Sequence, residues 1–135
     1  MIKFQELKVG DYVMTSNEGD MRRGEVTRLN KNEKQVCVDN GIQEFWYETD
    51  QISPLELNDE ALTLLKFHKE IQANGSAKYS KGAFRMIVPK ADNFSHLEIW
   101  YRDEKRHILQ NISLHTFQNH FHEMTKMYLN ELVFD

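Results

Sequence analysis

A stripe of apolar residues near the C-terminus imposes the strongest structural requirement on this chain. Its members recur at steps of three or four positions: Leu114, Phe117, Phe121, Met124, Tyr128 and Leu132. This spacing is typical of a helix with one apolar face, and Ser113 stands where a helix N-cap is expected. A helix of about 20 residues is ~30 Å long. We therefore expect a long C-terminal helix that lies across a small sheet.

The sequence before this stripe supplies strands for such a sheet. Alternating apolar residues predict short antiparallel strands at 77–79, 84–88, 96–101 and 107–110. Upstream of them, Asn58 is the expected N-cap of a first helix, and the acids Asp59 and Glu60 meet its positive end. We expect this helix to run to about His68.

The segment from Leu7 to Leu55 has a different pattern, in which short strands are separated by turn residues. Strands are expected at 12–14, 24–29, 35–39, 42–49 and 52–55. Asn40-Gly41 predicts a tight hairpin, and Pro54, which has no amide proton, ends the ladder. Four strands and a short fifth match an SH3-like barrel in size, and an open meander packed on the second half is the alternative architecture.

The predicted fold class is therefore α+β. It comprises an N-terminal SH3-like small β-barrel, a helix, a small antiparallel sheet and the long C-terminal helix. The corresponding modules are residues 1–55 and 56–135. Because a barrel of about fifty residues is only marginally stable alone, we expect the two modules to pack together as one compact unit.

Composition restricts the classes of partner. The net charge is −4 and is spread over the chain, which argues against non-specific nucleic-acid binding, since phosphate affinity comes mainly from clustered Lys and Arg. Cys37 is the only cysteine, so no intramolecular disulfide forms. The segment 1–9 lacks the apolar core of a signal peptide, and no stretch approaches transmembrane length. We expect a cytoplasmic location and no membrane partner.

The aromatic run Phe45-Trp46-Tyr47 is the first candidate binding site. Strand alternation sends Trp46 to one face of its sheet and the other two rings to the opposite face. All three rings therefore cannot enter one core, and an aromatic surface can be left for a protein partner. The alternative is that the second module covers this surface, since aromatic side chains are more often buried than used for binding.

The segment 66–90 is the second candidate, because its six basic residues face a single acid, Glu70. Lys78, Lys81 and Arg85 surround the expected hairpin turn and predict a phosphate-contacting surface. The alternative is an ordinary solvated loop.

Histidines on the C-terminal helix are weak metal-ligand candidates. His115 and His122 are expected on its solvent side, opposite the apolar stripe. Their separation of seven residues places them about 10 Å apart along the axis, whereas zinc-binding helical pairs are four residues apart. A solvated polar face is the favoured interpretation, so we expect no metal and no cofactor. Glycine-rich phosphate loops and nucleophile elbows are also missing from the sequence.

Three blocks of the sequence carry a resemblance when taken together. They are Glu6–Val13, Ile52–Leu62 followed by Phe67, and His115–Phe121 continuing through Met124-Thr125 to Glu131-Leu132. In this order they resemble a family of small uncharacterised bacterial and phage proteins, with an N-terminal β module and a C-terminal helix in which His, Gln and Asn precede an aromatic residue. The chain departs from it at Asp11, where the family has Asn, and at Lys126, where a lost Gly should lengthen the final helix. The resemblance implies architecture and a phage or mobile-element context, but no activity.

These observations favour a non-enzymatic binding or accessory protein whose partner is another protein. Two alternatives stay open: a nucleic-acid-associated protein that uses the basic segment 66–90, and a hydrolase whose catalytic residues are scattered along the chain. Homodimerisation is also open, because Met127 and the tail Val133-Phe134 lie outside the apolar stripe and can pack on a second copy.

Overall fold

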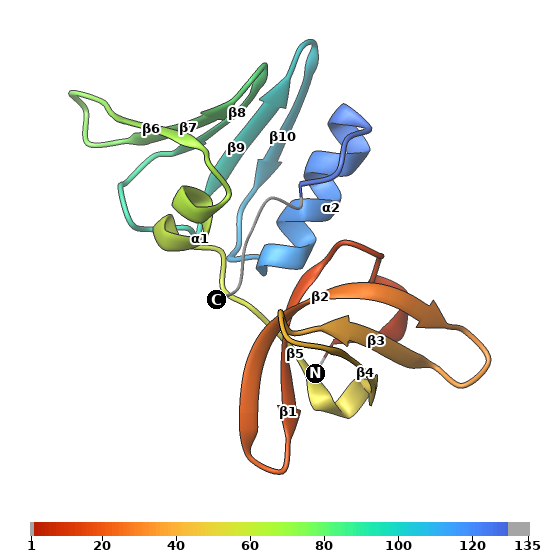
Figure 1. Ribbon diagram of the computed structural model, residues 1–135. Helices are drawn as coiled ribbons and strands as arrows, with labels where there is room; N and C mark the ends of the chain where they lie inside the picture. The colour runs from red at the N-terminus through yellow and green to blue at the C-terminus, as the bar shows by residue number, and fades with distance from the viewer. Residues whose placement is uncertain (1, 130–135) are drawn as a thin grey trace.

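The computed structural model describes residues 2–129, and it consists mostly of two antiparallel five-stranded sheets (Figure 1). The first sheet has the strand order β4-β3-β2-β1-β5. Its strands are β1 (Tyr12–Asn17), β2 (Asp20–Asn30), β3 (Gln35–Asp39), β4 (Glu44–Glu48) and β5 (Ile52–Pro54). Short 3-10 turns, η1 (Phe4–Glu6) and η2 (Thr49–Gln51), precede β1 and β5. The strand positions agree well with the turn signals in the sequence.

The first sheet is curled but not closed, so the predicted SH3-like barrel is wrong. β4 and β5 form its two edges, and they do not pair with each other. Only η2 joins them, and the chain from Glu48 to Ile52 can span at most about 14 Å, so the sheet must bend strongly. Its inner face holds a small core: Ile2, Leu7, Val13, Val26, Val36, Val38, Tyr47 and Ile52.

The second sheet has the order β10-β9-β8-β7-β6. Its strands are β6 (His68–Ile71), β7 (Ala77–Lys81), β8 (Phe84–Val88), β9 (Leu97–Tyr101) and β10 (Glu104–Ile108). The extra strand β6, which was not predicted, begins at His68, where the first helix was expected to end. That helix, α1 (Asp59–Leu64), has the predicted Asn58 cap, whose Oδ1 accepts the Ala61 N–H at 2.9 Å. It ends early because Lys66 adopts a left-handed conformation with φ 66°.

The C-terminal helix α2 (Leu114–Thr125) is also shorter than predicted. Lys126 ends it in the left-handed conformation, with φ 63° and its N–H donating to the His122 carbonyl at 2.7 Å. The loss of a glycine at this position therefore does not lengthen the helix. Leu132 and the tail Val133-Phe134 lie outside the described residues.

α2 covers one face of the second sheet, as its apolar stripe predicts (Figure 1). Phe117 is fully buried, with ring centroids 5.9 Å from Phe67 and 5.8 Å from Phe84. Phe121 adds a closer contact, 4.7 Å from Phe84. Burial of these rings is the main source of stability in this half of the molecule.

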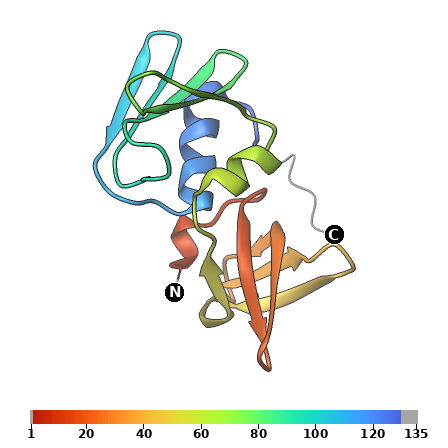
Figure 2. The same cartoon turned by 90° about the vertical axis from the view of Figure 1, so that its left-hand side faces the viewer.

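The two sheets meet through α2 and the chain that precedes α1. The Leu114 N–H donates to the Leu55 carbonyl at 2.8 Å, and Glu56 forms a bridge with Ser113. From the first sheet, Tyr12 is fully buried in the core of the second half. Figure 2 shows η1 beside the start of α2, so the polar side of this helix faces the N-terminal segment. Among the described helices, none is long and apolar enough to cross a membrane.

Candidate functional site

The aromatic run lies on β4, with two of its rings exposed. In the pairing of β4 with β3, Phe45 is opposite Val38 and Tyr47 is opposite Val36. The Phe45 and Tyr47 rings therefore lie on the inner face of the first sheet, and Trp46 lies on the outer face. Tyr47 is buried, but Phe45 and Trp46 are each 44% exposed. The second half of the molecule therefore does not cover these two rings.

Among residues 2–129, no strand pairs with the outer edge of β4. In an antiparallel ladder, successive residues point their peptide groups alternately toward and away from the neighbouring strand. The Glu48 N–H points away from β3, since it donates to Gln51 Oε1 at 2.9 Å. Trp46, two residues earlier, consequently presents its N–H and C=O groups on the free side. This places a main-chain donor and acceptor beside the exposed rings.

A pocket of about 270 Å³ opens next to Phe45 at the end of the inner face. Ile42, Phe45 and Tyr47 form its apolar wall, and Ile42 is 75% exposed. Asp20 and Arg22 lie on the opposite wall and neutralise each other through a 2.9 Å ion pair. The pocket therefore has one apolar wall, and the rest of its lining is polar. We use the name β4 edge surface for the free side of β4 together with Ile42, Phe45 and Trp46.

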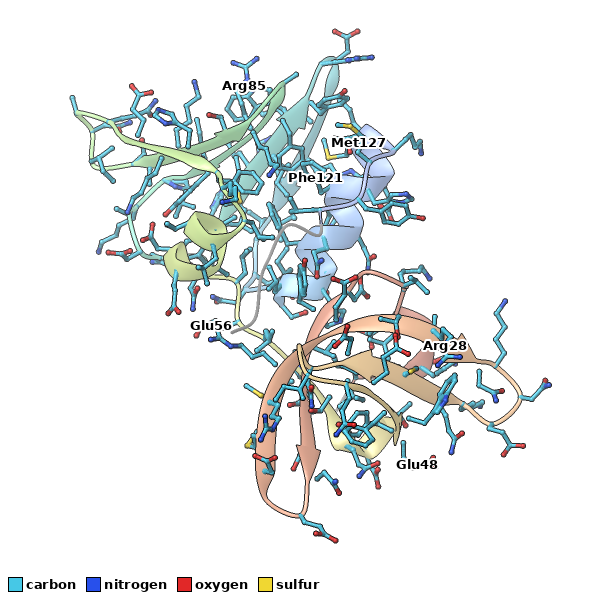
Figure 3. The ribbon with its side chains drawn as sticks, viewed as in Figure 1. Arg28, Glu48, Glu56, Arg85, Phe121 and Met127 are labelled. Carbon is cyan, nitrogen blue, oxygen red and sulfur yellow. The ribbon has the colours of Figure 1, made fainter. Side chains whose placement is uncertain are left out.

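The outer side of this surface carries charge. The Arg28 guanidinium lies 5.3 Å from the Trp46 ring centroid and 3.1 Å from Glu44 Oε2. Arg28 and Glu48 project from this sheet in Figure 3. Glu48 accepts a hydrogen bond from Gln35 Nε2 at 2.9 Å. Two acids thus flank Trp46 along the edge strand, and only Glu44 has a basic partner among these contacts.

The predicted basic site is only partly assembled. Lys78 and Arg85 point away from α2, and the pairing of Arg85 with Trp100 puts them on the same uncovered face of the second sheet. The Arg85 guanidinium lies 5.4 Å from the Trp100 ring centroid. Lys81 lies on the other face, where its Nζ donates to the Leu65 carbonyl at 2.8 Å. Lys105, which pairs with Trp100 on the uncovered face, was not predicted from the sequence.

The two helix histidines differ: His115 is buried, contrary to expectation, whereas His122 is partly exposed. His115 is 2% exposed, and burial lowers its pKa although the neighbouring Glu6 carboxylate acts to raise it. Its Nδ1 lies 2.9 Å from Ser113 Oγ, but its Nε2 is 3.8 Å from Glu6 Oε1, beyond hydrogen-bonding length. This serine–histidine contact therefore lacks the orienting hydrogen bond of a nucleophilic site.

His122 instead stacks on Tyr128, with ring centroids 4.3 Å apart. Within residues 2–129, no three His, Cys, Asp or Glu side chains are grouped so that they could hold a metal ion. His115 and His122 consequently have no described partners for a shared metal site.

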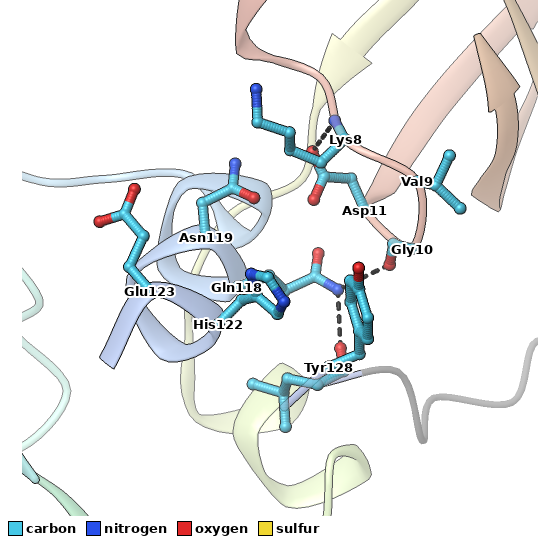
Figure 4. Close-up of a pocket in the computed structure, with 10 residues that line it drawn as sticks. Lys8, Val9, Gly10, Asp11, Gln118, Asn119, His122, Glu123 and Tyr128 are labelled. Carbon is cyan, nitrogen blue, oxygen red and sulfur yellow. Dashed lines mark hydrogen bonds between the residues drawn. The ribbon is translucent and has the colours of Figure 1, made fainter. Parts of the chain in front are cut away.

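A second pocket, which the sequence did not predict, lies where α2 meets the turn at residues 8–11 (Figure 4). We call it the junction pocket. Asp11 forms part of its wall and is 2% exposed, and its Oδ2 accepts the Lys8 N–H at 2.9 Å. Burial raises the pKa of this carboxyl from 3.8 to about 7, although hydrogen bonds from the Lys8 backbone and the Asn119 side chain act to lower it.

Gln118 fixes the base of the junction pocket. Its Oε1 accepts the Tyr12 N–H at 2.8 Å, and its Nε2 donates to the carbonyls of Gly10 at 2.9 Å and Leu129 at 2.8 Å. Gly10-Asp11 and Gln118 are both visible in the sequence, but 106 residues separate Tyr12 from Gln118. No local pattern indicates that these segments meet.

Comparisons with known proteins add no further assignment. No protein-family model matches the chain, and neither a curated protein nor a solved structure matches it. The resemblance to the bacterial and phage family stays a prediction. A functional proposal must rest on the residues and their geometry.

Proposed function

We propose that this protein is a binding module that captures an extended segment of another protein at the β4 edge surface. The observation that carries the proposal is the combination of two exposed aromatic rings with a free strand edge. An extended peptide that adds to such an edge gains main-chain hydrogen bonds, while pockets for alternate side chains supply specificity. Both elements are present on β4.

The surface also defines the chemistry of the segment. On the inner side, a residue of the peptide enters the apolar wall formed by Ile42 and Phe45. On the outer side, Glu48 favours a basic residue of the peptide, whereas Glu44 is already paired with Arg28. The partner is therefore an extended segment that alternates apolar and basic side chains. An exposed strand edge otherwise promotes aggregation, which native proteins usually prevent.

Selection from a library of displayed twelve-residue peptides tests the proposal, followed by calorimetry on an enriched peptide. Phe45→Ser removes the apolar wall, and Trp46→Pro removes the outward N–H but leaves the pairing with β3 intact. Each should weaken binding at least about tenfold, equivalent to about 1.4 kcal/mol.

Ile71→Ser is the matched control, because Ile71 is 57% exposed on β6, an edge strand of the second sheet. It should leave the affinity unchanged. Failure to enrich any peptide, or binding that survives both β4 substitutions, would refute the proposal.

A second candidate function is single-stranded nucleic-acid binding on the uncovered face of the second sheet. The observation that favours it is that Arg85 and Lys105 are the cross-strand neighbours of Trp100, with Lys78 on the same face in the next row of side chains. Basic side chains beside an aromatic ring suit a backbone phosphate and a stacked base. Glu70 and Glu98 share this face and oppose phosphate binding, so the affinity should be modest.

Fluorescence anisotropy with a labelled single-stranded oligonucleotide separates the two functions. Binding at this face should fall steeply with salt and should weaken in Arg85→Ala. Lys31→Ala, in the turn before β3, is the control. An oligonucleotide that does not bind at low salt would eliminate this candidate and leave the peptide proposal unaffected.

A further inference from the structure

We propose that the junction pocket binds a guanidinium group, presented by a small free molecule or by an arginine side chain. This site is separate from the β4 edge surface and does not depend on it. The pocket has a volume of about 240 Å³ and lies between the turn at residues 8–11 and α2 (Figure 4). Pockets for drug-sized ligands usually start near ~300 Å³. The junction pocket therefore suits a single small group.

The walls of the pocket are held in place before any ligand binds. Gly10 has φ 99°, which favours glycine, and its N–H donates to the Val26 carbonyl at 2.8 Å. The Val26 N–H in turn donates to the Asp11 carbonyl at 2.8 Å. Gln118 fixes the facing helix through its hydrogen bonds to Tyr12 and Gly10. A preorganised site loses little conformational entropy on binding.

The Asp11 carboxyl is the recognition group. A buried carboxylate is costly unless a cation and further N–H donors meet it. Its raised pKa, about 7, indicates that the donors from Lys8 and Asn119 do not fully compensate the burial. A guanidinium supplies both a positive charge and paired N–H donors, in a geometry that matches a carboxylate.

Two aromatic rings line the same pocket. The rings of His122 and Tyr128 stack at 4.3 Å with an interplanar angle of 25°. Tyr128 is 63% exposed, so its ring is accessible to a ligand. A planar guanidinium stacks on aromatic rings, whereas a lysine ammonium is a compact, strongly hydrated charge. This wall favours guanidinium over ammonium.

The other two charged residues that line the pocket have contacts of their own. Glu123 is a second lining carboxylate, which Arg106 contacts at 2.7 Å. Lys8 is the opposing cation, but its Nζ is directed to the Gln5 carbonyl at 3.5 Å. The exposed Lys8 side chain therefore need not occupy the space beside Asp11.

Chemical-shift titration of the ¹⁵N-labelled protein tests the inference with four probes at pH 8. Methylguanidinium and Nα-acetyl-arginine methylamide should shift the amide signals of Gly10, Asp11 and Asn119. The citrulline analogue has nearly the same shape without the charge, and the lysine analogue has the charge without the planar donors. Both should bind at least about tenfold more weakly than the arginine probe.

The arginine and methylguanidinium probes also distinguish the two sources of the group. An arginine probe that binds no tighter than methylguanidinium assigns the pocket to a small free molecule. Tighter binding by the arginine probe assigns it to an arginine side chain in a peptide. Equal binding of the citrulline analogue would overturn the inference.

Two variants locate the site. Asp11→Asn removes the charge while keeping the shape and should weaken guanidinium binding at least about tenfold. Tyr128→Ala, at an exposed ring, should weaken it by a smaller factor of about three to ten. Asp103→Asn, in the turn between β9 and β10, is the matched control and should bind like the wild type. Wild-type affinity in Asp11→Asn would overturn the inference.

The pH dependence gives an independent readout. Guanidinium binding should weaken about tenfold or more between pH 8 and pH 5.5, as Asp11 becomes protonated. Lys8, His122, Glu123 and Tyr128 also face this pocket. Asp11→Asn isolates the contribution of Asp11, because its residual binding keeps only that of these other groups. A wild-type affinity that is independent of pH would contradict the role of Asp11.

Discussion

The two buried faces of α2 hold the molecule together by different means. One face packs Phe117, Phe121 and Met124 against the second sheet, where contact depends on area rather than direction. The other face turns toward the N-terminal segment, where Gln118 forms directional hydrogen bonds with Tyr12 and Gly10 and His115 is buried beside Glu6. Both faces are buried in the structure, although only the first is apolar in the sequence.

The two faces of α2 should respond differently to residue substitutions. The apolar face belongs to a large core, so a lost ring affects the whole second half. The polar face connects the two halves of the molecule, and a few hydrogen bonds from Gln118 make this connection. Substitutions on the two faces should therefore differ in cost, in pH dependence and in the region that they loosen.

Phe117→Ala should have the largest effect. It removes a fully buried ring that contacts Phe67 and Phe84, and such truncations cost about 3–5 kcal/mol. Urea denaturation would measure the loss in the free energy of unfolding. Met127→Ala is the control, because Met127 is 56% exposed and should change stability by less than about 0.5 kcal/mol. A loss below about 1 kcal/mol for Phe117→Ala would mean that this core is not close-packed.

Asp11→Asn should have the next largest effect, and one that depends on pH. The folded pKa of Asp11, about 7, lies above the ordinary value of 3.8, so between these values the folded state binds more protons than the unfolded state. Wild-type stability therefore contains a contribution that is full below pH ~4 and is lost as pH rises to ~7. Asparagine keeps its stability across this range.

The measurement is the difference in unfolding free energy between Asp11→Asn and the wild type. It should shift by about 3 kcal/mol in favour of the variant between pH 4.5 and pH 8. Asp103→Asn controls for a general change in charge and should leave the pH dependence of the wild type unchanged. Parallel pH profiles for Asp11→Asn and the wild type would show that the Asp11 carboxyl is hydrated in solution.

Gln118→Leu should cost about 2–3 kcal/mol, because it leaves buried backbone groups without partners. The groups concerned are the Tyr12 N–H and the carbonyls of Gly10 and Leu129. Hydrogen exchange should show faster exchange in β1 than in β8, since the substitution weakens the connection between the two halves but not the apolar core. Uniform acceleration in both sheets would instead show that this connection and the core unfold together.

Sequence periodicity predicted the apolar face of α2 and the strand positions because these are local properties. Strand pairing across the ends of the first sheet is not local, so the short β5 was compatible with either a barrel or an open sheet. The early ends of α1 and α2 depend on Lys66 and Lys126 in left-handed conformations, which lysine rarely adopts. No sequence signal for such a cap exists without a glycine.

The candidate sites show the same distinction between local and non-local information in the sequence. Alternation correctly placed Trp46 opposite Phe45 and Tyr47, because it needs only the strand itself. It also separates Lys78 from Lys81, although a charge count groups them. The contact of Gln118 with the N-terminal turn was not predicted because 106 residues separate Tyr12 from Gln118. The homodimer prediction for Met127 and Val133-Phe134 stays a prediction, since 133–134 lie outside the described residues.

Arg106→Ala should have the smallest effect on the free energy of unfolding. It tests the partly exposed contacts between β10 and α2. Its guanidinium contacts Glu104 at 2.8 Å, Glu123 at 2.7 Å and His120 Nδ1 at 2.8 Å, which ties β10 to the helix. These partners are partly exposed, so solvent screens the ion pairs and the loss should be about 0.5–1 kcal/mol. Lys105→Ala, on the opposite face of β10, is the control. High salt should reduce the difference between Arg106→Ala and the wild type, whereas a loss above about 2 kcal/mol would place the Arg106 ion pairs among the buried contacts of the helix.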